Sequence, residues 1–326
     1  MPITSIGSYG PTMQEFETNW TQANSELGAP PDPTPITLAG GYTLGQFQID
    51  KPAVLTSIEE VHIYLEQART AATGRDGAKL ALIERGKQFR NSVLAQITDK
   101  SYTQNLPTLP NTGHDLSKFS EPLDAMRRLW ERINQNAMQL GLSGDLTLQG
   151  GYTQAQFGGG ITQIAAYYND AERAEENAGF ARTKRDNSTS AIYERMKQYR
   201  AAAPAMLPAN SPALMNLPRL SPIPGTTPPG LEVTGEWNST QNQAYFSWPA
   251  STFHDLDKLQ VRGCTGSTYK AADEEVVADL LPTATSYATD WGLTAPGALA
   301  VYKVYVMATT GNENGGKAVK IVRPVT

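Results

Sequence analysis

The sequence is poor in the residues that carry most metal and acid–base chemistry. Its 326 residues include one cysteine, Cys264, and three histidines, His62, His114 and His254. A single thiol excludes an intramolecular disulfide and a tetrahedral thiolate metal site. No two histidines are four residues apart, and an internal repeat with an offset of 110 places Glu172 opposite His62. We therefore expect no repeated metal site or general base, and assign no catalytic residue, cofactor or metal.

The chain also lacks an excess of positive charge and any long apolar run. Charged residues make up 18% of it, and 27 basic against 32 acidic residues give a net charge of -5, which argues against a nucleic-acid partner. No window approaches the run of about 18 apolar residues that a membrane span requires. The start, MPITSIGSYGPT, has no basic segment followed by an apolar one. We expect a cytoplasmic protein by default, or one that reaches the cell exterior by a signal-independent route.

What the chain does contain is the same segment twice. Residues 36–90 match residues 146–200 at a constant offset of 110, without a gap. ITLAGGYTLGQF corresponds to LTLQGGYTQAQF, and ALIERGKQFR corresponds to AIYERMKQYR. Upstream, Trp20 falls opposite Trp130. Each copy has the size of a small domain, so we expect a first repeat over residues 1–110 and a second repeat over residues 111–222.

Periodicity predicts three helices in each repeat. Apolar residues at helical spacing surround Trp20 and Trp130 and predict a first helix. The phrase GGYT then predicts a turn, in which Thr43 and Thr153 are N-caps of the next helix. A second helix is expected over about 52–73 and a third from near Asp76, with counterparts in the second repeat. The expected architecture is two tandem three-helix units whose cores are separate or joined through a modest interface.

Several polar residues are identical in the two repeats. Arg75-Asp76 corresponds to Arg185-Asp186, and Glu84-Arg85 corresponds to Glu194-Arg195. Such pairs can be ion pairs that brace the start of the third helix, or they can line a shared binding surface. The structural interpretation explains better why each acid lies beside a base. Both alternatives stay open, and the pairs are candidate interface or structural residues.

Two further matched pairs belong to the same set of candidates. Tyr42 and Tyr152 lie in the GGYT turns, and Arg90 and Arg200 end the shared segment. Aromatic residues and arginine are favoured anchors of protein interfaces. Tyrosines can equally be half-buried in a core with the hydroxyl group satisfied. We therefore treat these four residues as candidate interface or structural residues.

The composition changes from about residue 221. SPIPGTTPPG, residues 221–230, is typical of a linker, and about seven short alternating segments come after it, which predict a β-sandwich over residues 223–326. This part resembles a fibronectin type III module in residues 228–233, 245–249 and 302–308. The resemblance implies that Trp248 and Tyr302 pack between the sheets. The sequence has no Arg-Gly-Asp, so integrin-type adhesion is not implied.

The helical repeats resemble uncharacterised bacterial proteins, which imply no activity. The duplication, the proline-rich joints and the terminal sandwich favour a non-enzymatic structural protein that forms a homo-oligomer or polymer, as the subunit of a filament, layer, tube or particle appendage. The alternative is a monomeric binding module or adaptor that recognises a protein or glycan, with the sandwich as one binding surface. An enzyme ranks last of the three.

Overall fold

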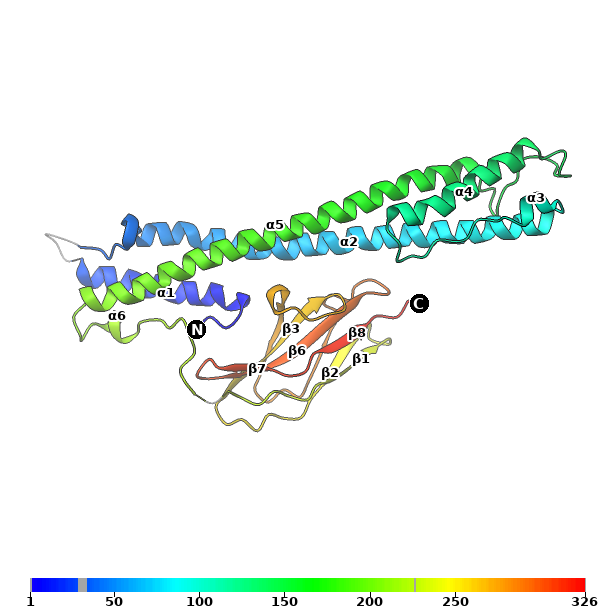
Figure 1. The fold of residues 1–326 in the computed structure, drawn as a ribbon. Helices are drawn as coiled ribbons and strands as arrows, with labels where there is room; N and C mark the ends of the chain where they lie inside the picture. The colour runs from blue at the N-terminus through cyan, green and yellow to red at the C-terminus, as the bar shows by residue number, and fades with distance from the viewer. Residues whose placement is uncertain (1, 29–33, 226, 326) are drawn as a thin grey trace. The chain divides into compact units, whose positions relative to one another are not determined.

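The structure is a computed structural model that describes residues 2–28, 34–225 and 227–325 (Figure 1). A helical part is followed by an antiparallel β-sandwich of two sheets, so the predicted fold class is confirmed. The chain divides into two compact units. Unit 1 comprises the residues up to Glu59 and those from Lys184 onward, and unit 2 comprises Glu60–Thr183. These units do not follow the expected boundaries at residues 110 and 222.

A tryptophan-bearing helix opens each repeat, as the periodicity predicts. These helices are α1 (Tyr9–Leu27) in unit 1 and α4 (Leu116–Gln135) in unit 2. The Asp115 carboxylate caps α4 by accepting a hydrogen bond from the backbone N–H of Lys118. The buried positions recur every three or four residues along both helices: Met13, Phe16 and Trp20 in α1, and Phe119, Leu123, Met126, Trp130 and Ile133 in α4. One apolar face of each helix therefore enters a core.

The expected second and third helices are one continuous helix in each repeat. These are α2 (Leu44–Gln96) and α5 (Gln154–Met206), each of 53 residues. The expected break before Asp76 is wrong: Gly74 and Gly77 lie inside α2, and neither has a positive φ. Each glycine costs a helix about 1 kcal/mol, which packing elsewhere along the helix can offset. Asp76 and Asp186 are therefore interior helix residues and cap no helix start.

The GGYT phrase forms the predicted turn into each long helix. Gly40 and Gly41 have φ of 74° and 75°, and Gly150 and Gly151 have φ of 78° and 71°. Only glycine adopts this region without strain, which explains the double glycine. At the start of α5 the Thr153 hydroxyl accepts from the Gln156 N–H at 3.3 Å, while the Gln156 side chain accepts from the Thr153 N–H at 2.8 Å. This is the predicted capping box.

Each helical core draws on both repeats, which overturns the expectation of one core per repeat. In unit 1, α1 and the start of α2 pack against the end of α5, through Ile192, Met196 and Tyr199. In unit 2, α4 and the start of α5 pack against the end of α2, through Leu82, Phe89 and Val93. The cause is the continuity of α2 and α5, because the far half of each long helix lies in the other unit.

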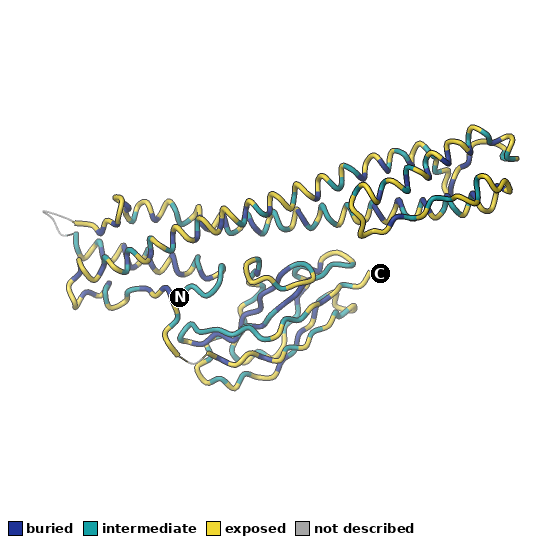
Figure 2. The backbone as a smooth tube through the Cα atoms, viewed as in Figure 1, coloured by how far each residue is buried: buried dark blue, intermediate teal, exposed yellow. Residues whose placement is uncertain are grey.

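Within residues 227–325 of the described chain, eight strands form the sandwich. One sheet has the order β1-β2-β5, and the other has the order β4-β3-β6-β7 with β8 paired to β6. Buried residues concentrate in β3 and β6 (Figure 2). The strands are β1 (Thr234–Asn238), β2 (Gln243–Ser247), β3 (Leu256–Thr265), β4 (Glu275–Leu280), β5 (Ser286–Thr289), β6 (Leu299–Ala308), β7 (Glu313–Gly315) and β8 (Val319–Val322).

The sandwich core contains the two aromatic residues that the resemblance implies. Trp248 and Tyr302 are both buried between the sheets, and Tyr302 lies 4.8 Å from Phe246, centroid to centroid. The Tyr302 hydroxyl donates to the carbonyl of Trp291, so its polar end is satisfied. The expected linker, residues 221–230, has no regular structure where it is described; Thr226 lies outside the described residues.

Short helical segments complete the described chain. They are η1 (Ile6–Ser8), η2 (Ala39–Gly41), α3 (Lys100–Thr103), α6 (Pro212–Met215) and η3 (Ala271–Asp273). Among the described helices, none is both long enough and apolar enough to cross a membrane.

Candidate interaction surfaces

Tyr42 is held in unit 1 by an arginine of the second repeat. The Arg195 guanidinium lies 4.4 Å from the centroid of the Tyr42 ring, within the range of a cation–π contact. Arg195 Nη1 also donates to the carbonyl of Ala39 at 3.0 Å, so one side chain holds both ends of the turn. The Tyr42 hydroxyl donates to Asp50 at 2.7 Å, and burial, together with this carboxylate, raises the pKa of Tyr42. Tyr42 is therefore a buried part of the turn.

Tyr152 has the equivalent surroundings in unit 2. The Arg85 guanidinium lies 4.3 Å from its ring centroid, and Arg85 Nη1 donates to the carbonyl of Gln149 at 3.3 Å. Burial raises the pKa of Tyr152 as well. Each arginine thus holds the turn of the opposite repeat. The expected pairing of Glu84 with Arg85 does not form in this structure: Glu84 pairs with Lys87 at 3.4 Å, while Arg85 donates to Gln88 at 2.8 Å.

Arg90 and Arg200 bind the loops that follow the two long helices. Arg90 Nη1 donates to the carbonyl of Pro107, and Arg200 Nη1 donates to the carbonyl of Pro218. The shared phrase Asn-Leu-Pro, at residues 105–107 and 216–218, supplies both acceptors. Both arginines are therefore structural in their described contacts.

The Arg-Asp pairs share one geometry but differ in exposure. In each pair the arginine Nε lies 2.9 Å from the aspartate Oδ1. The Arg185 side chain is only 5% exposed, whereas that of Arg75 is 29% exposed. Within unit 1, Arg185 Nη1 also donates to the carbonyl of Ala272 at 2.6 Å. Arg75 instead lies 5.6 Å from the ring of Tyr168 and borders a cavity.

The cavity beside Arg75, in unit 2, has a volume of about 650 Å³. Lys79 forms part of its wall and is 4% exposed. Its ammonium donates to the carbonyl of Thr112 at 2.8 Å and lies 4.6 Å from the Tyr168 ring centroid. The Tyr168 hydroxyl donates to the carbonyl of His114 at 2.6 Å. Lys79 and Tyr168 together secure the loop before α4, which is a structural task.

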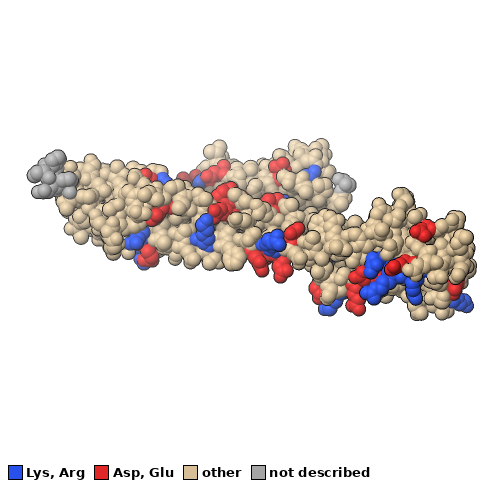
Figure 3. Space-filling view, turned by 90° about the horizontal axis from the view of Figure 1, so that it is seen from above, with Lys and Arg blue, Asp and Glu red and all other residues tan. Residues whose placement is uncertain are grey.

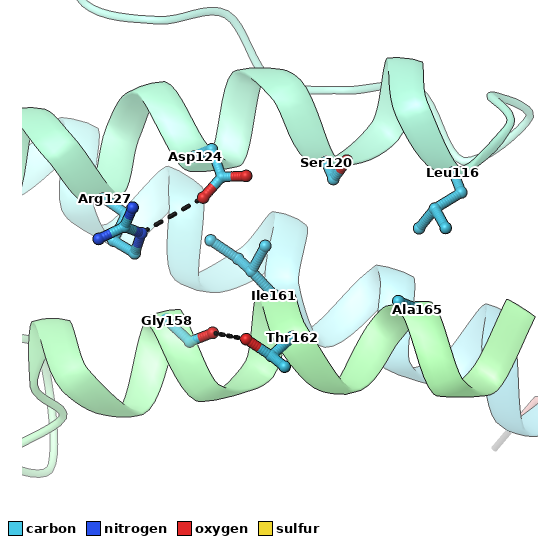
Figure 4. Close-up of a pocket in the computed structure, with 8 residues that line it drawn as sticks. All are labelled: Leu116, Ser120, Asp124, Arg127, Gly158, Ile161, Thr162 and Ala165. Atoms are coloured by element: carbon cyan, nitrogen blue, oxygen red, sulfur yellow. Dashed lines mark hydrogen bonds and ion pairs between the residues drawn. The ribbon is translucent and has the colours of Figure 1, made fainter.

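Unit 2 also has a groove between α4 and α5, with a volume of about 450 Å³. Figure 4 shows Ile161 projecting between the two helices, and Arg127 bonded to Asp124 at one end. The groove exists because several residues are small: Ser120, Gly158, Thr162 and Ala165.

The equivalent space in unit 1 is filled by larger residues. Counting back by 110, Gly158 and Ala165 correspond to Gln48 and Leu55. Gln48 donates to Glu17 at 3.1 Å, and Lys51 pairs with the same carboxylate at 2.7 Å. This ion pair holds the pKa of Glu17 below its usual value, because the Lys51 hydrogen bond favours the carboxylate. At positions 48 and 55 the first repeat therefore has larger residues than the second repeat has at the matched positions.

In the sandwich, the outer face of β3 carries a buried ionic network. Arg262 is fully buried; its Nη2 lies 2.6 Å from Glu313, and its Nη1 lies 2.9 Å from Glu274. Burial disfavours the Arg262 charge, but the hydrogen bond and charge of Glu313 outweigh it, so that the pKa of Arg262 is raised. The guanidinium also lies 4.0 Å from the Tyr305 ring. All partners are internal, which indicates a structural network.

Arg262, Lys79 and the turn-holding role of Arg85 and Arg195 were not predicted from the sequence. The alternation of Lys258, Gln260 and Arg262 along one strand was a usable signal, since a period of two places them on one face.

Cys264 is buried, and its thiol donates to the carbonyl of Lys270 at 3.2 Å. Burial raises the pKa of its thiol to about 11, which keeps it protonated at neutral pH.

Charges on the surface are mixed. On the face drawn in Figure 3, acidic and basic side chains lie beside one another. Within the described residues, no three metal-ligating side chains gather into a cluster. The described surface has hollows in both units, among them a cavity of about 230 Å³ beside Asp186 in unit 1, together with exposed apolar side chains.

No known protein family matches the chain, and no curated protein is detectably similar to it. Among solved structures, an Fn3-like protein from Clostridium thermocellum is 20% identical, covering 30% of this chain and 96% of that one, with a TM-score of 0.25. The fn3 domain of human contactin 1 is 12% identical, covering 32% and 81%, with a TM-score of 0.25. Pectate lyase PelI from Erwinia chrysanthemi is 17% identical over 28% of each chain, with a TM-score of 0.25. The chain thus spans little more than a quarter of that lyase.

Proposed function

We propose that this chain is a non-enzymatic structural protein that self-associates through protein–protein contacts. The observation that carries the proposal is the duplication itself: two helical units of one design in one chain provide two related surfaces. A surface that meets a complementary one on the next molecule without closing a ring propagates into a fibre or layer. The GGYT turns, each held by an arginine of the opposite repeat, are an example of such related features.

Exposed apolar side chains on the long helices support association. In unit 2, Phe180 is 72% exposed and Leu80 is 59% exposed, although both lie inside long helices. An exposed phenylalanine in a helix interior is costly to hydrate, and aromatic residues are enriched in interfaces. Leu80 also borders the cavity beside Arg75. Each of the two side chains is therefore a candidate contact between copies.

The experiment is size-exclusion chromatography with light scattering over a range of protein concentrations, together with negative-stain imaging. We expect mass to rise with concentration and ordered particles to form. Phe180→Ser should lower the association, whereas Arg173→Ser, an exposed residue of the same helix, should leave it unchanged. A monomer at every concentration would overturn the proposal.

The second candidate is a binding module, which the cavity of about 650 Å³ beside Arg75 favours. Its volume falls within the range of ligand-binding pockets, and it combines Leu80 and Tyr168 with the charged groups of Arg75 and Asp76. Under this alternative the protein stays monomeric, and Leu80→Glu abolishes the binding of a protein or glycan partner while the unfolding midpoint stays unchanged.

A further inference from the structure

The first and second repeats complete each other. In unit 1, Trp20 of the first repeat stacks on Tyr199 of the second, with centroids 4.8 Å apart and an interplanar angle of 27°. In unit 2, Trp130 of the second repeat stacks on Phe89 of the first, at 5.0 Å and 22°. Adding 110 to 20 and 89 gives 130 and 199, so the two contacts are the same contact with the repeats exchanged.

The polar contacts obey the same rule. Arg195 holds the turn of Tyr42, and Arg85 holds the turn of Tyr152, so each arginine again acts on the opposite repeat. In a symmetric dimer, a residue i of one subunit contacts j of its partner, and j contacts i in return. The two repeats show this reciprocal pattern within one chain.

Further contacts make the pairing specific. In unit 1, the Tyr199 hydroxyl donates to Asn19 at 2.7 Å, between buried residues of the two repeats. The hydroxyls of Ser57 and Ser188, also one from each repeat, are 2.7 Å apart. A repeat without its counterpart would expose Trp20 or Trp130 and leave buried polar groups unpaired. Exposing a large buried side chain lowers the free energy of unfolding substantially. A lone repeat is therefore an incomplete structure.

We propose that the first repeat of one chain can bind the second repeat of a second copy, through the contacts that close the monomer. The contacts are identical whether the counterpart belongs to the same chain or to another. What favours the closed monomer is the connection between α2 and α4, which holds the repeats at an effective concentration on the order of millimolar. Reciprocal exchange between chains gives a dimer, and non-reciprocal exchange gives an open chain of molecules. This pairing depends on the cores alone and is independent of the proposed function.

The test uses the whole protein, cut once. A protease site is inserted between Gln104 and Asn105, which are both exposed, and the folded protein is cut there. One preparation carries Ser57→Cys and an N-terminal tag, and the other carries Ser188→Cys; both carry Cys264→Ala. Equal amounts are mixed, unfolded in urea and refolded under oxidising conditions. A disulfide between positions 57 and 188 can then form only across two original molecules.

We expect a covalent product that joins the tagged first fragment to the second fragment of the other preparation. The positive control is the uncut chain with both substitutions, in which the disulfide forms within one molecule, because the two hydroxyls it replaces are already 2.7 Å apart. Ser57→Cys paired with Ser190→Cys, an exposed neighbour on the same helix, is the matched control and should not cross-link.

Capture on the tag gives a second measurement that needs no disulfide. The tagged first fragment should retain a second fragment, and isotope labelling of one preparation should show that about half of the captured second fragments come from the other preparation, as equal mixing requires. The proposal is overturned if the tagged fragment is recovered alone with its helical circular dichroism intact. It is also overturned if the positive control cross-links and the mixed preparations do not.

Discussion

Unit 1 and unit 2 each pack a matched tryptophan, Trp20 or Trp130, against an aromatic residue of the opposite repeat, but their surfaces differ. Between the first helix and the long helix, unit 1 has the Glu17–Lys51 ion pair, whereas unit 2 has a groove beside Ile161. At the Arg-Asp pair, unit 1 buries Arg185, whereas unit 2 leaves Arg75 beside a cavity. The core positions kept their chemistry because they must fit each other. Around these two positions the units differ in residue size and burial, so their surfaces are not equivalent there.

The largest expected effect tests the equivalence of the cores. Trp20→Ala and Trp130→Ala should each lower the free energy of unfolding by about 3–5 kcal/mol, since both tryptophans are fully buried. Urea unfolding followed by circular dichroism measures this, with the exposed Gln22→Ala as control. A loss below about 1 kcal/mol at either site would contradict the view that the two cores are equivalent.

The Arg-Asp pairs should differ in the same direction as their exposure. Arg185→Ala should cost about 1–3 kcal/mol, because it leaves the carbonyl of Ala272 without its donor. Arg75→Ala should cost no more than about 1 kcal/mol, because its ion pair is exposed to solvent. Thermal unfolding of the two variants checks this. A larger loss for Arg75→Ala than for Arg185→Ala would contradict the link between burial and structural role.

Trp→Phe substitutions sharpen the comparison of the cores. The Trp130 indole N–H donates to the carbonyl of Leu146 at 2.8 Å, whereas the Trp20 indole N–H has no partner among the described residues. Trp130→Phe should therefore cost about 1 kcal/mol more than Trp20→Phe, the net value of one hydrogen bond. Equal losses in urea unfolding would mean that the two indoles are equally satisfied.

The groove of unit 2 can be altered toward the residues of unit 1. Gly158→Ala should raise the free energy of unfolding by about 0.5–1 kcal/mol, since glycine is unfavourable inside a helix. Its new methyl group meets only the flexible Arg127 side chain, at 3.1 Å. Ala165→Leu fills the groove with the residue found at position 55. Lower self-association in Ala165→Leu with unchanged stability, by light scattering, would make the groove a contact site.

The smallest expected effect is a dependence of stability on pH. It arises at Glu17 in unit 1, whereas the matched position in unit 2 is Arg127. The folded state holds the pKa of Glu17 below its ordinary value through Lys51. The contribution to stability is therefore complete above the unfolded pKa of 4.5 and is lost as the pH falls through the lower, folded pKa. Lys51→Ile, which introduces the residue of position 161, should reduce this acid sensitivity, while the Gln48 hydrogen bond to Glu17 remains. Urea unfolding at pH 7 and at about pH 3 measures it.

Much of the fold could be predicted from the sequence, because the signals were local. The GGYT turn depends on two glycines with positive φ, and the first helices depend on the spacing of apolar residues around Trp20 and Trp130. The two sheets arise from alternation within short segments. The continuity of α2 was missed because Gly74, Asp76 and Gly77 weaken a helix locally, and only contacts distant in sequence offset that weakness.

The sequence alone determined that the chain holds two equivalent helical segments and a sandwich, since repetition and periodicity can be read from the order of residues. It also marked Tyr42, Tyr152, Arg90 and Arg200 as matched residues. Only the tertiary structure decided which repeat supplies the partner of each: Arg90 and Arg200 bind loops of their own repeats, whereas Tyr42 and Tyr152 contact arginines of the opposite repeat. A matched tyrosine and a matched arginine satisfy the same pattern whether the contact lies within a repeat or between repeats. For the two tyrosines, the contact lies between repeats. Each of the two uninterrupted 53-residue helices ends in the unit where the other helix begins, which brings the arginine of one repeat to the turn of the other.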